Sequence, residues 1–330
     1  MKNKIDYFQI IKDSIGLAKD NRFLWWFGFL SIFGGMSFSF NYNFPGNSSS
    51  NKKIDEMVYM NMMRRASFYW GLYWEWIILG IVLILLVCIG LYVVGIIGRG
   101  ALIDSIFKVN KKEETNFSSG FKRGIYFLKR LFLTNLLFFI SIIISTFVLV
   151  FPVARLFILK SYVIAFSMGL VAFVLLISIL ILFFYFKRYT EMYLISSDLN
   201  IINSIKLAYR LFEKNIKESF IMSLLLMVVN LVMGTILFVA LIVILVPVGV
   251  LGAIIYGLVG KLVLVILASL VFLMLVGALI FISSILNVFV QSVWVLFFIQ
   301  IAKQKKIDDA LLTDKKSIEL LDKSEVEPII

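Results

Sequence analysis

The chain has 330 residues, of which 61% are hydrophobic and only 16% are charged. Soluble domains are about 45–50% apolar and about 25% charged, so this composition excludes a single soluble enzyme, a disordered chain and a disulfide-stapled scaffold. A net charge of +12 would suggest nucleic acid in a soluble protein, but in a membrane protein basic residues hold loops in the cytoplasm and face anionic headgroups. We therefore predict an all-α polytopic membrane helical bundle with no nucleic-acid partner.

Six apolar runs predict six transmembrane helices, because about 20 apolar residues cross a bilayer. In chain order they are Phe23–Phe40, Trp74–Ile97, Leu131–Phe151, Tyr162–Phe186, Phe220–Pro247 and a run that begins at Leu262. The sixth run, residues 262–301, contains 40 residues without a charge. It forms either one long helix with an intracellular extension or two short spans.

The basic residues favour one long helix. With six spans, 25 of the 32 lysines and arginines lie in the two termini and the even-to-odd loops, and seven lie on the opposite side. This asymmetry predicts a multi-pass protein of the plasma or bacterial inner membrane with both termini in the cytoplasm. A seventh span would place the basic C-terminus outside.

Three of the predicted cytoplasmic segments resemble one another. Ile5–Asp20, Phe117–Leu131 and Ile201–Lys214 each have the period of a basic amphipathic helix, and each precedes an odd-numbered span. Ser14–Ala18 also matches Ser204–Ala208 in letters. The predicted apolar faces are Phe8, Ile11, Ile15 and Ala18; Phe117, Phe121, Leu128 and Leu131; and Ile201, Ile205, Ala208 and Phe212.

These segments suggest that one membrane domain, residues 1–303, contains three repeats of an amphipathic helix followed by two spans. The repeat units would be residues 1–110, 111–198 and 199–303, followed by a mixed-charge cytoplasmic tail, residues 304–330. The alternative is that any helix beside a membrane looks amphipathic. The first outer loop is expected to contain a short surface helix at Ile54–Ala66, and the Gly-rich Val248–Gly260 a re-entrant segment.

Few residues in the predicted spans could carry chemistry. The chain has no histidine, and its single cysteine, Cys88, cannot form an intrachain disulfide. Glu75 is the only acidic residue in a predicted span, and it lies between two tryptophans at an interface. We therefore predict that the protein is not an enzyme and needs no cofactor or metal.

The best candidate site lies where the even-numbered spans continue into the cytoplasm. Arg99, Arg188 and Gln291 occupy similar places in the three proposed units, and Asn287 precedes Gln291 by one helical turn. These four side chains could line a vestibule for an anionic headgroup or solute. The alternatives are that the arginines snorkel to the interface and that the amides hydrogen-bond neighbouring helices.

The segment Phe8–Leu30, FQIIKDSIGLAKDNRFLWWFGFL, and its echo at Ile201–Lys214 give the chain a family resemblance. It resembles the membrane domain of some bacterial glycerophosphodiester phosphodiesterases and the uncharacterised stand-alone relatives of that domain. The resemblance implies a lipid-associated helical membrane module. The family's catalytic domain has no counterpart in this chain, so no catalytic residue is carried over.

We therefore expect a non-enzymatic module in lipid or solute transport, whose partners are membrane lipids with anionic headgroups at the cytoplasmic face. The alternative is a scaffold or assembly subunit of a membrane protein complex. That alternative implies a membrane protein partner or a homo-oligomer. A wet cavity that exposes Asn287 or Gln291 would favour transport, and a dry bundle with an apolar side groove would favour the scaffold.

Overall fold

The computed structural model describes residues 5–34, 52–259 and 261–324, and every regular element in this part of the chain is a helix. In order they are α1 (Tyr7–Asp20), α2 (Phe23–Gly34), α3 (Lys52–Asn110), α4 (Phe117–Ile158), α5 (Tyr162–Ser196), α6 (Ile201–Lys214), α7 (Ile216–Val259) and α8 (Lys261–Ser324). The predicted all-α class is therefore confirmed.

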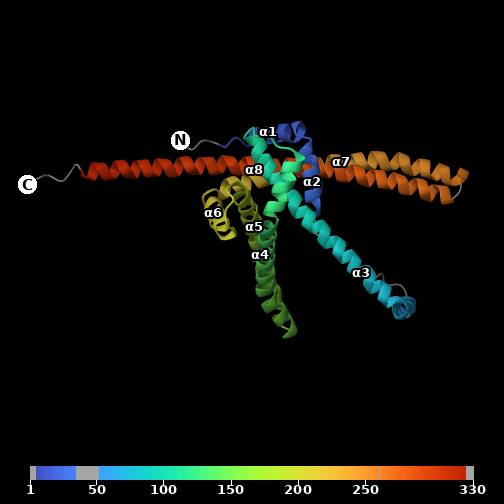
Figure 1. The fold of residues 1–330 in the computed structure, drawn as a ribbon. Coiled ribbons are helices and arrows are strands. Elements are labelled where there is room, and N and C mark those ends of the chain that lie inside the picture. Colours follow the sequence, from blue (N-terminus) through green and yellow to red (C-terminus); the bar gives the residue numbers. More distant parts are fainter. Residues whose placement is uncertain (1–4, 35–51, 260, 325–330) are drawn as a thin grey trace, which may run out of the picture.

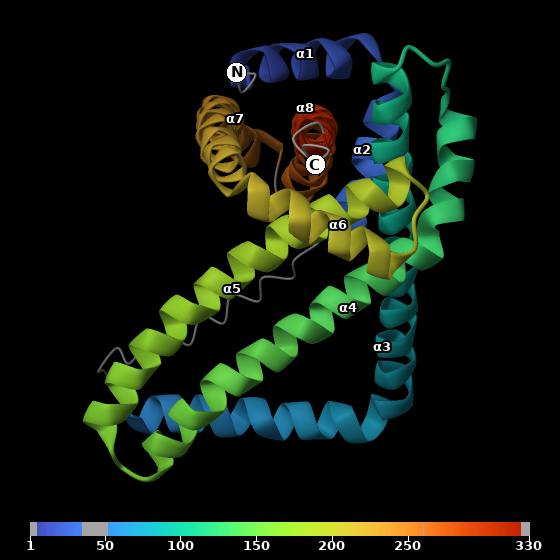
Figure 2. The same cartoon turned by 90° about the vertical axis from the view of Figure 1, so that its left-hand side faces the viewer.

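The helices form one packed hub from which three long arms project, and the C-terminal part of α8 leaves the hub on the side opposite the α7–α8 hairpin (Figures 1 and 2). The hub consists of α1, α2, α6 and the parts of the five long helices that adjoin them. One arm is the distal part of α3, the second is the α4–α5 hairpin, and the third is the α7–α8 hairpin. The hub therefore contains contributions from every helix, whereas each arm contains at most two.

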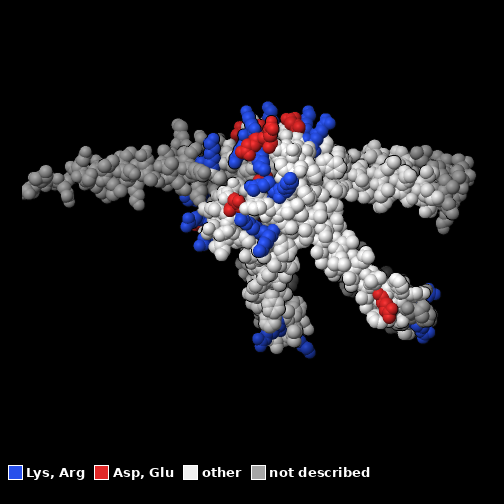
Figure 3. Space-filling model, viewed as in Figure 1, with Lys and Arg blue, Asp and Glu red and all other residues white. Residues whose placement is uncertain are grey.

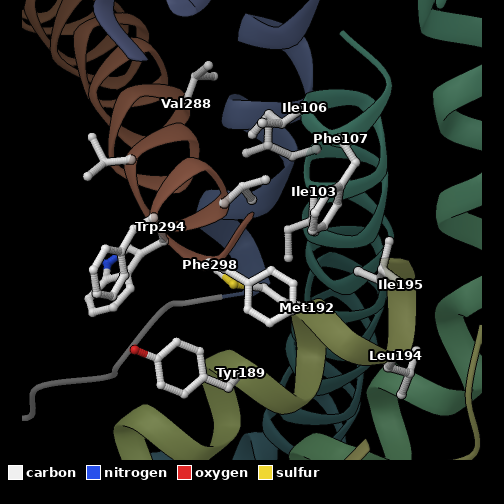
Figure 4. Close-up of a cluster of buried hydrophobic side chains, with 14 of the residues drawn as sticks. Ile103, Ile106, Phe107, Tyr189, Met192, Leu194, Ile195, Val288, Trp294 and Phe298 are labelled. Atoms are coloured by element: carbon white, nitrogen blue, oxygen red, sulfur yellow. The ribbon is translucent and has the colours of Figure 1, made fainter. Parts of the chain in front are cut away.

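The buried core lies in the hub. Ile103 and Ile106 from α3 face Met192 from α5 and Phe298 from α8, and none of these four side chains is more than 3% exposed (Figure 4). Aromatic rings extend this core, because Tyr193 meets Phe298 edge-on with 4.8 Å between ring centroids. Burial and ring packing of this kind are the main stabilising terms of a folded domain.

Five helices are long and apolar enough to cross a membrane, which confirms a multi-pass architecture. The most hydrophobic window of each is at most 6% buried inside the protein. The predicted first span is represented by α2, whose 12 residues reach only about 18 Å at about 1.5 Å per residue. Residues 35–40 of that span lie outside the described part of the chain, so the sixth crossing stays a prediction.

The sixth apolar run forms one continuous helix, α8, as the distribution of basic residues favours. The part of α8 around Val293 and Val295 lies fully buried in the hub, which explains why this apolar run exceeds one bilayer thickness. The helix also continues past residue 303 to Ser324, so no break in α8 marks the predicted start of the tail.

Two predictions for the distal loops can be compared with the structure. The segment Val248–Val259 continues α7 as helix and forms no loop, while its re-entry into the membrane stays a prediction. Pro247 lies inside α7 without ending it. In the first outer loop, the expected surface helix is present as the first part of α3, which bends at the non-helical residue Tyr73 (φ −125°, ψ 15°).

The predicted inward faces of the three repeated segments are partly wrong. In α1, Phe8 and Ile15 are 77% and 52% exposed, while Ile10, Ser14 and Ala18 are buried. In α4 and α6 the buried faces likewise begin at small residues: Gly120 and Gly124 in α4, and Ser204 and Ala208 in α6.

Close helix contact is the physical reason for these faces. A Cβ atom at Gly124 would lie 2.4 Å from the carbonyl oxygen of Ile97 in α3, so only glycine allows the two backbones to approach so closely. Ser14 and Ser204 occupy one position in the match between the first and third segments, and both are buried, as Gly124 is in the second segment. The order of elements and this shared position agree with three units, although equivalence of the units in space stays a prediction.

The charged side chains follow the division between hub and arms. On the face seen in Figure 3, lysines and arginines gather over the hub, while few mark the arm tips. Arg155 and Lys160 lie at the tip of the α4–α5 hairpin, where Lys160 closes the turn with a left-handed φ of 57°. The location of the hub on the cytoplasmic side of the membrane is a prediction from the distribution of basic residues and not a finding from the fold.

Candidate functional site

Helices α3, α5 and α8 bring three of the four predicted site residues together in the hub. The Nη1 atom of Arg188 in α5 donates a hydrogen bond of 2.6 Å to Oε1 of Gln291 in α8. The Nη1 atom of Arg99 in α3 lies 3.4 Å from Oε1 of Glu191 in α5. Because Glu191 follows Arg188 by less than one turn, these two contacts form one polar cluster across three helices.

We define the hub cluster as Arg99, Lys187, Arg188, Glu191 and Gln291. Lys187 and Arg188 both lie close enough to Arg99 and Glu191 to interact electrostatically with them. The cluster therefore contains three cations and one carboxylate, which leaves two net positive charges. An anion that entered this cluster would meet more positive than negative charge.

The carboxylate of the cluster is buried, and the cations are partly exposed. The side chain of Glu191 is 4% exposed and that of Arg99 is 20% exposed. Removing one partner from a buried ion pair typically costs about 3–5 kcal/mol, so Arg99 stabilises the buried carboxylate of Glu191. The buried Nε atom of Arg99 has no hydrogen-bond partner within the described residues, which leaves a donor for a ligand.

Aromatic rings fix the position of Arg188. Its guanidinium carbon lies 5.5 Å from the ring centroid of Phe184 and 5.5 Å from that of Trp294. The planar guanidinium suits such stacking and also binds two oxygens of a phosphate or carboxylate at once. Trp294 is 2% exposed, so the ring that supports Arg188 is held by the core.

The fourth predicted residue, Asn287, lies elsewhere in the hub. Its Nδ2 atom donates to the carbonyl oxygen of Gly28 at 3.2 Å and to Oγ of Ser31 at 2.6 Å. Ser284, one turn away on α8, donates from Oγ to the carbonyl oxygen of Trp25. Asn287 thus attaches α2 to α8, which agrees with the alternative of a helix–helix hydrogen bond.

The prediction from sequence did not include Glu191 and Lys187. Both residues lie in the inward continuation of the predicted fourth span, from which only Arg188 was taken as a site residue. The sequence does contain one relevant spacing, because Lys187 and Glu191 are four residues apart on a helix. This spacing does not show that the carboxylate is buried beside Arg99.

Two other carboxylates of the hub also have cationic partners. Asp104 forms ion pairs with Lys108 at 2.8 Å and with Arg123 at 3.5 Å. Slight burial raises the pKa of Asp198, but hydrogen bonds from Arg130 and Tyr126 and the nearby positive charges outweigh this effect, so the pKa is lowered. The Asp104 group has two cations for one carboxylate, so its surplus of one positive charge is smaller than the surplus of two in the hub cluster.

The comparisons with known proteins add no assignment: no family model, no curated protein and no solved structure matches the chain. Within the described residues, no three His, Cys, Asp or Glu side chains gather as ligands for a metal ion. The resemblance of the opening segment to the phosphodiesterase-associated membrane domain stays a prediction.

Proposed function

We propose that the protein is a non-enzymatic membrane module that binds an anionic phosphate or carboxylate group at its hub cluster in the course of lipid or solute transport. The group belongs to a lipid headgroup in the cytoplasmic leaflet or to a small anionic solute. The single observation that carries the proposal is the surplus of two positive charges among partly buried side chains.

The cost of burying charge supports this function. A partly buried cation without a counter-ion is unfavourable, and an incoming anion would relieve the repulsion between Arg99 and Arg188. Arg188 follows the first residue of α5 by 26 positions, which is about 39 Å of helix at about 1.5 Å per residue. The apolar core of a bilayer is about 30 Å thick, so Arg188 would lie at headgroup level if the arm tip reaches the opposite interface.

The resemblance of Phe8–Leu30 to a lipid-associated membrane domain supports the same class of ligand. We expect the headgroup to bind through two oxygens to the guanidinium of Arg188, with Arg99 supplying its free Nε donor. Gln291 would then orient Arg188 without touching the ligand.

The test is charge reversal in the purified full chain, with Arg99→Glu and Arg188→Glu combined. The protein is placed in nanodiscs of phosphatidylglycerol and phosphatidylcholine, and the lipids retained on release into detergent are counted by native mass spectrometry. We expect retention of phosphatidylglycerol to fall, and addition of inorganic phosphate to displace it from the wild type if free anions bind the same groups.

The matched control is Arg155→Glu with Lys160→Glu, two exposed cations at the distal tip of the same hairpin. Lipid retention that changes equally in both double variants, or in neither, would contradict the proposal. Because charge reversal beside Glu191 could impair folding, Arg188→Gln serves as a milder second variant. Its unfolding temperature shows whether a loss of lipid reflects a loss of fold.

A scaffold or assembly subunit is the second candidate, and one observation favours it. The most apolar windows of α3, α7 and α8 are 0% buried within the chain, so each arm offers a full helical surface to lipid, to another protein or to a second copy. The mass of the protein in nanodiscs shows whether lipid alone, another protein or a second copy covers the arms. A complex that keeps its mass in the charge-reversed variant would support the scaffold.

A further inference from the structure

An open groove of about 630 Å³ lies at the edge of the hub, apart from the hub cluster. It is lined by Arg22, Phe23 and Trp26 at the start of α2 and by Phe117 at the start of α4. Its volume falls within the range of about 300–1,000 Å³ that is typical of ligand sites. One cation and three aromatic rings therefore surround a space large enough for a ligand.

The aromatic walls of the groove are fixed in place. The ring of Phe117 stacks on the buried ring of Phe27 with 4.9 Å between centroids and an angle of 13°. Asn116 holds the start of α4 through a capping box with Ser119, so Phe117 cannot move away without loss of the cap. The groove is therefore preformed.

The corner between α1 and α2 is also held. The Nε1 atom of Trp25 donates a hydrogen bond of 2.8 Å to the carbonyl oxygen of Ala18, and Nδ2 of Asn21 donates to that of Leu17. These bonds fix Arg22 and Trp26 on one side of α2, four residues apart. Arg22 takes part in none of the ion pairs of the described residues.

Helix α1, which precedes the groove residues in the chain, carries an exposed stripe of its own. Phe8, Lys12, Ile15 and Lys19 follow one helical stripe and all four are exposed. Alternating apolar and basic side chains on one exposed stripe are typical of helices that lie on an anionic membrane surface. Asp13, on the adjacent stripe, accepts a hydrogen bond from Gln9 at 2.7 Å, and the exposed Asp20 is the one carboxylate close to Arg22 in sequence.

We propose that this groove binds one anionic phospholipid, with its phosphate on Arg22 and its glycerol and upper acyl chain on Trp26 and Phe117. Arg22 directly precedes α2, and Trp26 is the fourth residue of that helix, so the groove changes from cationic to apolar within about one turn of helix. Trp26 is 65% exposed and Phe117 is 41% exposed. An interfacial tryptophan beside an arginine suits the boundary between headgroup and acyl chain.

This lipid site is independent of the proposed function of the hub cluster, because the two share no residue. The test uses nanodiscs with equal amounts of phosphatidylglycerol and phosphatidylcholine, in which either lipid carries bromine on its acyl chain near the headgroup. Bromine quenches tryptophan fluorescence at contact. We expect brominated phosphatidylglycerol to quench the wild type more strongly than brominated phosphatidylcholine.

Two variants locate this effect. Trp26→Phe should abolish the difference between the two lipids, whereas Trp76→Phe, which changes another exposed tryptophan (71% exposed) on the arm of α3, should keep it. Arg22→Gln should weaken phosphatidylglycerol binding about fivefold, and Arg65→Gln should leave it unchanged. All four side chains are exposed, so the fold should tolerate each change.

Equal quenching by both lipids, or an unchanged preference in Arg22→Gln, would overturn the groove proposal. The result for Arg99→Glu with Arg188→Glu separates the two sites. A variant that loses lipid at the hub cluster but keeps the preference reported by Trp26 supports two sites. The two sites would not be independent if Arg22→Gln, or the double variant Arg99→Glu with Arg188→Glu, lost both the lipid retained at the hub cluster and the lipid preference reported by Trp26.

Discussion

The hub and the arms differ in what surrounds the same kinds of side chain. Leu86 and Leu102 lie on one helix, α3, yet Leu86 is 63% exposed in the arm and Leu102 is fully buried in the hub. Lipid must cover Leu86 if the arm crosses a membrane, whereas other side chains of the protein cover Leu102. Apolar residues in the arms therefore specify partition into the membrane, and those in the hub specify the fold.

Polar side chains show the same division. In the arms, Ser141 donates to the carbonyl oxygen of Leu137 and Thr235 to that of Leu231, so their hydroxyls are satisfied within one helix. In the hub, Arg188 and Gln291 hydrogen-bond across helices. Changes in the hub should therefore affect stability and binding, while matched changes in the arms should affect neither strongly.

The largest expected difference concerns two phenylalanines of α4. Phe127 is fully buried in the hub and Phe147 is 65% exposed in the arm. Phe127→Ala should destabilise the protein by about 3–5 kcal/mol because it leaves a cavity, and Phe147→Ala by less than about 1 kcal/mol because lipid fills the space. Reversible unfolding in mixed micelles measures both values, and equal losses would show that the arm is packed as tightly as the hub.

Two glycines should respond to alanine with opposite signs. A Cβ atom at Gly124 would meet the Ile97 backbone at 2.4 Å, whereas one at Gly80 would meet nothing within 4 Å. Gly124→Ala should therefore cost about 1–3 kcal/mol, while Gly80→Ala should be neutral or stabilise its helix by up to about 1 kcal/mol. The same unfolding measurement applies, and a stable Gly124→Ala would refute the close contact between α3 and α4.

A smaller effect is expected at two asparagines. Asn287→Ala removes the hydrogen bonds to Ser31 and Gly28 and should cost about 0.6–1.7 kcal/mol, the range for such bonds in membrane proteins. Asn230 is exposed on α7, so Asn230→Ala should change the free energy of unfolding by less. A larger loss at Asn230 would indicate that another chain or helix packs against the arm.

The smallest effect should depend on pH. The folded protein lowers the pKa of Asp198, so this residue stabilises the fold above its unfolded pKa of about 3.9, and the contribution disappears as the pH falls through the lowered pKa. Asp198→Asn should therefore lower the unfolding temperature slightly at pH 7 and not at all at pH 2. An equal shift of the unfolding temperature at both pH values would assign the effect to the shape of the side chain instead of its charge. Asp20→Asn, a change at another exposed aspartate, is the control.

Composition and helical period predicted the class of fold because both act locally. The apolar runs could be located without knowing any contact, and the distribution of basic residues favoured one helix for α8. The inward faces of α1 and α4 could not be predicted in the same way, because contacts over small residues such as Ser14 and Gly124 decide them. Glu191 was missed for a similar reason, since its burial depends on Arg99, which is 92 positions away.

The most direct test of the hub as an anion-binding centre compares two changes that each neutralise one charge of the cluster. Glu191→Gln raises the net charge of the cluster from two to three, and Arg188→Gln lowers it to one. We predict that nanodisc-released protein retains more phosphatidylglycerol in the first variant and less in the second, as counted by native mass spectrometry. Loss of lipid in both variants, or in neither, would contradict an anion site and leave the cluster with a purely structural role.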